Sequence, residues 1–86
     1  MYRVYVLQNP KSSELYYGFS SDLRQRIRAH QESKKHAGWI LVYYEAYRDE
    51  RDARERERKL KQYGAARGHL RVRIARSTSK GLESAG

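Results

Sequence analysis

Three segments hold most of the apolar and aromatic side chains of this chain, and this distribution requires a fold built on a sheet. Residues 2–8, 15–19 and 39–47 are rich in Tyr, Val, Leu and Ile, which suit a pleated, half-buried surface. Residues 9–13 (NPKSS) between the first two segments have turn chemistry, which predicts a hairpin. The third segment is apolar on both faces, so we expect it to be the central strand.

The remaining segments predict helices. A serine cap and Asp22 open one that runs to about Glu32, and Asp49 opens a second one from Glu50 to about Tyr63. Gly64 follows where a left-handed end residue is typical, and residues 70–76 form a last amphipathic piece. The order is strand, strand, helix, strand, helix, helix. We therefore expect an α/β fold of the α+β type, with a three-stranded antiparallel sheet flanked by helices.

A chain of 86 residues has room for one domain. We assign it to residues 1–76 and expect residues 77–86, which are rich in Ser, Thr and Gly, to be a disordered tail. The absence of cysteine excludes disulfides, a cysteine-bound metal and a cysteine nucleophile. No apolar run has the length of a membrane span and no secretion signal is apparent, so we expect no membrane partner and a cytoplasmic location.

The charge balance points to a polyanionic partner. Nineteen Lys and Arg residues against ten Asp and Glu residues give a net charge of +9, and thirteen of the cations are arginines. The planar guanidinium fork suits phosphate well. Because the arginines are interleaved with tyrosines rather than set beside exposed Leu and Phe, nucleic acid is favoured over a membrane surface.

Two basic side chains, Arg26 and His30, border the apolar stripe of the first predicted helix. Leu23 and Ile27 define that stripe, and at 100° per residue His30 and Arg26 lie about 20° and 60° from Leu23. A functional role for Arg26 competes with a simpler alternative, in which its stem lies along the core edge and its head stays in water.

The second predicted helix places one carboxylate on its buried side. Ala53 and Leu60 form the stripe, and Glu57 lies four residues after the first and three before the second. A carboxylate there must be paired, protonated or bound to a metal, because an unpaired buried charge costs several kcal/mol. An ion pair with an arginine of the sheet and a metal site both remain open.

Taken together, these residues resemble the motifs of the GIY-YIG nuclease superfamily. In that family a tyrosine closes a first strand motif, and a second tyrosine eleven residues later opens the next motif. An arginine, a histidine one helical turn further, and a glutamate on a later helix follow. The corresponding residues here are Tyr5 in Arg3-Val4-Tyr5, Tyr16 in Tyr16-Tyr17-Gly18, and then Arg26, His30 and Glu57.

The likeness covers nearly all of residues 1–76 and is greatest to the small single-domain bacterial members. The chain is also similar to the nuclease domain of the excinuclease incision subunit. Residues 39–45 (WILVYYE) and 56–61 (RERKLK) resemble the third strand and the glutamate helix of those proteins. Arg3, Val4 and Tyr17 replace the usual Gly, Ile and Ile, and a late asparagine of some members has no counterpart.

The resemblance implies a role for each of these side chains. Glu57 would hold one divalent cation, Mg²⁺ or Mn²⁺, and Arg26 would bind phosphate oxygens. Tyr5 would orient or deprotonate the attacking water, Tyr16 would hydrogen-bond a water or phosphate oxygen, and His30 would orient Tyr5 or share proton transfer.

Further cations would bind the nucleic acid without reading its sequence, and we assign this role to Arg26, Lys34, Lys35 and Lys61. The leading hypothesis is a metal-dependent endonuclease that hydrolyses phosphodiester bonds in DNA. It would be structure-selective or nonspecific and would act in repair or recombination. A catalytically inactive nucleic-acid-binding protein of the same fold and a protein-interaction module that uses the tyrosine-rich sheet are the alternatives. RNA as the substrate and the oligomeric state remain open.

Overall fold

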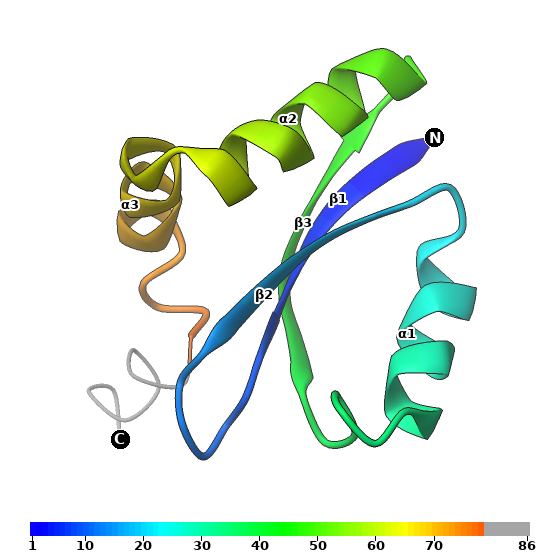
Figure 1. Cartoon of the computed structure of the whole chain (residues 1–86), viewed down its shortest axis with the longest axis vertical. Coiled ribbons are helices and arrows are strands. Elements are labelled where there is room, and N and C mark those ends of the chain that lie inside the picture. The colour runs from blue at the N-terminus through cyan, green and yellow to red at the C-terminus, as the bar shows by residue number, and fades with distance from the viewer. Residues whose placement is uncertain (79–86) are drawn as a thin grey trace.

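A computed structural model gives the arrangement of residues 1–78, and the description below concerns these residues. The elements follow the predicted order, as Figure 1 shows: β1 (Tyr2–Gln8), β2 (Leu15–Ser20), α1 (Leu23–Glu32), β3 (Ile40–Tyr47), α2 (Glu50–Gln62) and α3 (Gly64–Arg73). The three strands form one antiparallel sheet, so the predicted α+β class and the predicted order of elements along the chain are confirmed.

The strand order in the sheet is β2-β1-β3, which makes β1 central. The prediction that the third apolar segment is the central strand is therefore wrong. β1 buries Val4, Val6 and Leu7 almost completely, whereas β3 leaves Ile40 and Tyr44 about half exposed. The error arises because tyrosines supply much of the apolar character of β3, and tyrosine also suits an exposed edge, where its hydroxyl reaches water.

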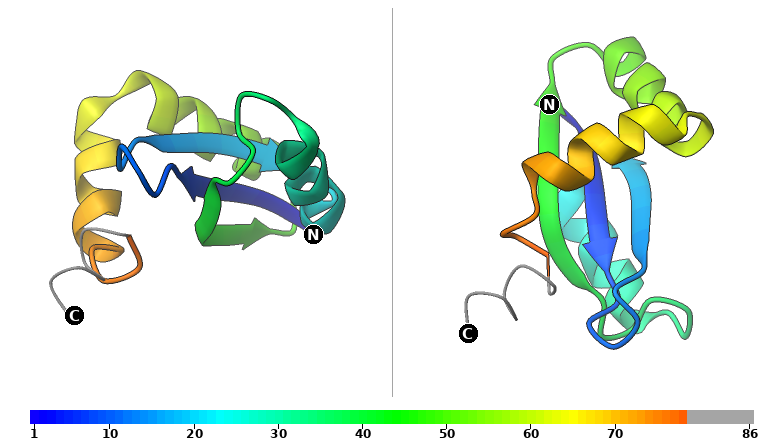
Figure 2. Two further views of the ribbon diagram at one scale, coloured as in Figure 1. Left: turned by 90° about the horizontal axis from the view of Figure 1, so that it is seen from below. Right: turned by 90° about the vertical axis from the view of Figure 1, so that its left-hand side faces the viewer.

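The helices cover the two faces of the sheet unequally. α2 and α3 lie on one face, with α2 toward the β2 edge and α3 crossing back over the sheet, and α1 lies on the opposite face (Figure 2). The core lies under α2 and α3 and consists of Val4, Val6, Tyr17, Ala53, Leu60, Leu70 and Ile74. α1 contributes no buried residue, and its predicted stripe is only partly buried. The α1 face is thus the open face of the sheet.

The helices α1 and α2 each begin at an aspartate cap. The Asp22 carboxylate accepts a hydrogen bond from the Gln25 backbone N–H at 3.1 Å, and Asp49 accepts one from the Arg51 N–H at 2.8 Å. The expected serine cap of α1 takes a supporting role, because the Ser20 hydroxyl bonds the Asp22 backbone and not the helix.

The junction of α2 and α3 differs from the prediction. Gly64 does not take a left-handed conformation at the end of α2. It begins α3, which therefore starts six residues before the predicted piece at residues 70–76. The chain turns instead at Tyr63, whose backbone is extended, and the Arg67 guanidinium donates to the carbonyls of Leu60 and Lys61, both at 2.9 Å. These carbonyls of the last α2 turn thus receive a side-chain donor and need no glycine cap.

Of the tail predicted for residues 77–86, the structure describes only the first two positions. Thr78 is buried, and its hydroxyl donates to the Ala75 carbonyl at 2.9 Å. Residues 79–86 lie outside the described part of the chain. Within residues 1–78, no helix combines the length and the apolar character needed to cross a membrane.

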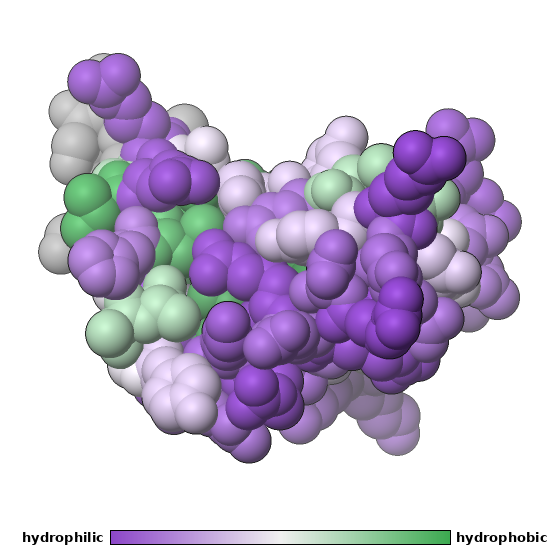
Figure 3. All heavy atoms as spheres, turned by 90° about the horizontal axis from the view of Figure 1, so that it is seen from above, coloured by the Kyte–Doolittle hydropathy of each residue, from purple (hydrophilic) through white to green (hydrophobic). Residues whose placement is uncertain are grey.

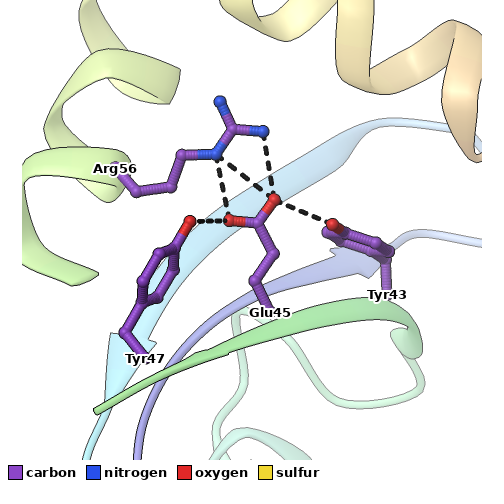
Figure 4. Close-up of polar contacts among 4 residues, drawn as sticks. All are labelled: Tyr43, Glu45, Tyr47 and Arg56. Atoms are coloured by element: carbon purple, nitrogen blue, oxygen red, sulfur yellow. Dashed lines mark hydrogen bonds and ion pairs between the residues drawn. The ribbon is translucent and has the colours of Figure 1, made fainter. Parts of the chain in front are cut away.

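A partly buried ion pair joins α2 to β3. The Arg56 guanidinium donates to both carboxylate oxygens of Glu45 at 3.0 Å, and the hydroxyls of Tyr43 and Tyr47 donate to the same carboxylate at 2.8 and 2.6 Å (Figure 4). Burial alone would raise the pKa of Glu45, but the bonds from Arg56, Tyr47 and Tyr43 outweigh it and lower the pKa. Burial also raises the pKa of Tyr47 to about 12, so its phenol stays a donor at neutral pH.

This network matters because it adds directional contacts to a helix with few buried apolar residues. The helix buries only Ala53 and Leu60, and its outer face is strongly hydrophilic, with apolar surface gathered mainly toward α3 (Figure 3). Arg56 precedes Glu57 in the chain. The bond between Arg56 and Glu45 thus sets the direction in which the next side chain projects.

We predict that Glu45→Ala lowers the free energy of unfolding by about 2 to 3 kcal/mol, because it leaves Arg56 and two phenols without their common acceptor. Urea unfolding followed by circular dichroism measures the change. The matched control is Glu55→Ala on the exposed face of α2, which we expect to cost less than about 0.5 kcal/mol. Equal effects of the two substitutions would contradict the role of the network.

Candidate active site

The geometry of the site depends on Gly18 of β2, which has no side chain. Tyr5 lies opposite Gly18 in the antiparallel register of β1 and β2. A Cβ atom built on Gly18 would collide with the Tyr5 ring at its Cζ and hydroxyl end. The phenol therefore lies directly over Gly18 and reaches across β2 on the open α1 face. The backbone of Gly18 is not left-handed, so the glycine is needed here for space alone.

The Tyr5 hydroxyl lies 2.7 Å from Nε2 of His30 on α1. Burial is the main cause that raises the pKa of Tyr5 above its usual range, and the nearby Tyr16 and Glu57 act in the same direction. Burial, His36 and Arg26 lower the pKa of His30. Both groups are then neutral at pH 7, and in the tautomer of His30 that is protonated at Nδ1 the phenol donates and the imidazole Nε2 accepts.

Two charged side chains, Arg26 and Glu57, also act on the pKa of Tyr5. Arg26 opposes the rise in the Tyr5 pKa, and Glu57 supports it. Both charged side chains therefore lie close enough to Tyr5 to act on its phenol. The structure thus brings together side chains from β1, α1 and α2 that lie far apart in the sequence.

Glu57 lies between the buried Ala53 and Leu60, with 21% of its side chain exposed. The Lys61 ammonium is 3.2 Å from its Oε2 atom and 5.9 Å from the centre of the Tyr16 ring. Lys61 therefore links the carboxylate to the second tyrosine. The alternative for Glu57 was an ion pair with an arginine of the sheet. No such pair forms among the described residues. The partly buried ion pair joins Glu45 and Arg56 instead.

Two further aromatic groups, His36 and Trp39, complete the cluster, and no spacing in the sequence pointed to them. The His36 ring is 4.5 Å from Tyr16, 4.9 Å from His30 and 4.8 Å from Trp39, as measured between ring centres. His36 is only 6% exposed. It lies in a loop without periodicity, so its spacing indicated no function, and its nearness to Trp39 in the sequence was the only available signal.

The predicted nucleic-acid contacts fall into two groups. Arg26 and Lys61 belong to the cluster around Tyr5 and Tyr16, and both are exposed. Lys34 and Lys35 lie in the exposed loop after α1, where Lys35 joins burial in lowering the pKa of His36. The loop lysines are thus at the margin of the cluster, where they are free to meet a long polyanion.

The cluster offers one carboxylate, that of Glu57, as a ligand for a divalent cation. Within residues 1–78, no three His, Cys, Asp or Glu side chains gather in a way that could hold a metal ion. The partly exposed Glu57 carboxylate, which is close enough to Tyr5 to raise its pKa, fits an ion such as Mg²⁺, which keeps several waters and takes phosphate oxygens as further ligands. The donor set thus suits a cation that is completed by substrate.

Comparison with known proteins agrees with this arrangement. Residues 1–69 match the family model described as the GIY-YIG catalytic domain. Neither the comparison with curated proteins nor the comparison with solved structures finds a match. The matched range contains all of the side chains gathered around Tyr5.

The partly buried His30 and the buried His36 predict a pH dependence of stability. The folded protein keeps His30 and His36 neutral below the ordinary imidazole pKa, so the unfolded chain binds more protons as pH falls. The free energy of unfolding should therefore decrease from pH 7 to pH 5. In the double variant His30→Gln/His36→Gln, urea titrations should show a smaller decrease over this interval. A decrease of the same size as in the wild type would contradict the prediction.

Proposed function

The chain belongs to the GIY-YIG family, and we propose that it is a metal-dependent endonuclease that hydrolyses phosphodiester bonds in DNA. Members of this family are endonucleases that generally depend on a divalent metal. The observation that carries the proposal is the convergence of Tyr5, His30 and Glu57 from three different elements at the β2 edge.

The proposed reaction begins with activation of water. The raised pKa of Tyr5 leaves little phenolate at neutral pH, but in the tautomer of His30 that is protonated at Nδ1 the Tyr5 hydroxyl donates to Nε2. As water approaches phosphorus, the Tyr5 oxygen accepts its proton while the phenolic proton passes to Nε2 of His30. The resulting hydroxide forms the new P–O bond, the bond to the leaving oxygen breaks, and that oxygen takes a proton from solvent. Tyr5 thus relays a proton without accumulating as phenolate.

The charges around the phenol would stabilise the transition state. The Arg26 guanidinium would bind the non-bridging oxygens of the phosphate through its planar fork. A divalent cation held by Glu57 would supply positive charge to the phosphate and the leaving oxygen. Lys61 would orient the Glu57 carboxylate, since it pairs with only one of its oxygens.

Binding would come from cations outside the cluster and would carry little sequence preference. Lys34 and Lys35 are exposed beside the site, and the chain carries a net charge of +9. Contacts of this kind neutralise phosphates and fix the position of the duplex, but they do not read bases. We therefore propose structure-selective or nonspecific cleavage, with a role in repair or recombination.

We predict that cleavage of a nicked or branched DNA with Mg²⁺ or Mn²⁺ falls about a hundredfold or more in Glu57→Gln, because the cation loses its charged ligand. Arg26→Lys should lose about tenfold or more, because an ammonium cannot form the bidentate contact. Gel assays of the cleaved strand, with binding measured in parallel, quantify both losses.

The matched controls lie on the same two helices. Glu55→Gln and Arg28→Lys change exposed side chains of α2 and α1 to which we assign no role, and both should retain wild-type rates. Cleavage that persists in Glu57→Gln would contradict the proposal. Binding without any cleavage by the wild-type protein would favour the inactive nucleic-acid-binding alternative.

A further inference from the structure

A groove of about 490 Å³ lies on the open face of the sheet, between α1 and β3. This volume is within the range of sites that hold a nucleotide-sized ligand. Its apolar lining consists of Leu23, Ile27, Leu41 and Tyr44. None of these side chains is fully buried, and Tyr44 is 52% exposed. The groove therefore offers apolar and aromatic surface that the fold itself leaves uncovered.

The polar lining of the groove is cationic. Arg3 and Arg24 contribute to its walls, and the Arg3 guanidinium lies 5.9 Å from the centre of the Tyr44 ring. Asp22 is the acidic residue among the lining side chains, and one of its carboxylate oxygens already accepts the cap hydrogen bond from Gln25. An aromatic ring with a guanidinium near its face, in a groove that a second arginine also lines, complements a base joined to a phosphate.

The groove lies immediately beside the candidate active site. Tyr44 is the register partner of Tyr5, so the two residues are adjacent across β1 and β3. α1 contributes residues to the surroundings of both side chains. At 100° per residue, Ile27 and Arg24 lie on one side of Leu23 and His30 and Arg26 on the other. The same helix thus presents one flank to the Tyr5 phenol and the opposite flank to the groove.

We infer that this groove binds an unpaired nucleobase next to the phosphate at the active site, with the base stacked on Tyr44 and its phosphate held by Arg3 and Arg24. The inference rests on the proposed function and adds a substrate class to it. A base inside a duplex cannot reach an aromatic ring between a helix and a strand, whereas a base from a single-stranded segment can. The groove would therefore select nucleic acid with a single-stranded segment beside the cleaved bond.

The test measures binding without chemistry. A fluorescently labelled single-stranded DNA and the blunt duplex of the same sequence are titrated with protein in EDTA, where metal-dependent cleavage does not occur. Tyr44→Ala should weaken binding of the single strand about tenfold, the size expected for the loss of one stacked base. Duplex binding should change less than about twofold, because it rests on phosphate contacts elsewhere. Tyr44→Phe keeps the ring and should retain the affinity for the single strand.

Tyr63→Ala is the matched control, because Tyr63 is also 52% exposed but lies at the junction of α2 and α3. It should leave binding of both DNAs unchanged. Three results would each overturn the inference: an equal loss for single strand and duplex in Tyr44→Ala, no loss for either, or a loss in Tyr44→Phe as large as in Tyr44→Ala. A concentration-dependent dimer that Tyr44→Ala abolishes while DNA binding is kept would assign the groove to a second copy of the chain and would also overturn it.

Failure of this inference can be told apart from failure of the proposed function. Tyr44-dependent binding of single strands by a protein that never cleaves DNA would support the groove and contradict the nuclease. Metal-dependent cleavage by a protein whose binding does not depend on Tyr44 would support the nuclease and contradict the groove.

Discussion

The absence of a side chain at Gly18 is the constraint on which the candidate site depends. Since β1 is the central strand and Tyr5 lies in its buried part, Tyr5 reaches the edge of the sheet only by crossing a neighbouring strand. Tyr5 crosses β2 at Gly18, where the ring occupies the space that a Cβ would fill. The phenol thereby stays anchored in the interior while its hydroxyl meets His30 and approaches the charges of α1 and α2.

The second requirement is a helix held at the correct rotation. α2 is charged along most of its length, so apolar burial at Ala53 and Leu60 fixes its distance from the sheet better than its angle. The pair of Glu45 with Arg56 adds a directional contact from the far edge strand. Paired groups of this kind contribute specificity of arrangement more than net stability. The partly buried Glu45 carboxylate thus helps to position α2 through Arg56, and Glu57, which follows Arg56, lies near the site.

Much of this architecture was accessible from the sequence, because the underlying signals are local. Runs rich in β-branched and aromatic residues indicated the strands, and helical spacing placed Glu57 between Ala53 and Leu60. The position of β3 at an edge was missed, because strand order depends on packing between segments and not on their composition. Gly64 was misassigned because Arg67, three residues later, supplies the cap. The packing of His36 depends on the path of a loop, which no periodicity encodes.

The most direct test of this account is the ring contact between Tyr5 and His30 in Gly18→Ala, measured by nuclear Overhauser effects in the labelled protein. We expect the variant to remain folded, at a cost of about 1 to 3 kcal/mol for the added methyl group, because the displaced atoms belong to a side chain that can rotate. The contact between the two rings should disappear while the amide spectrum of α2 and α3 is preserved. A contact of undiminished strength would show that the phenol does not depend on the space at Gly18, and would contradict the account.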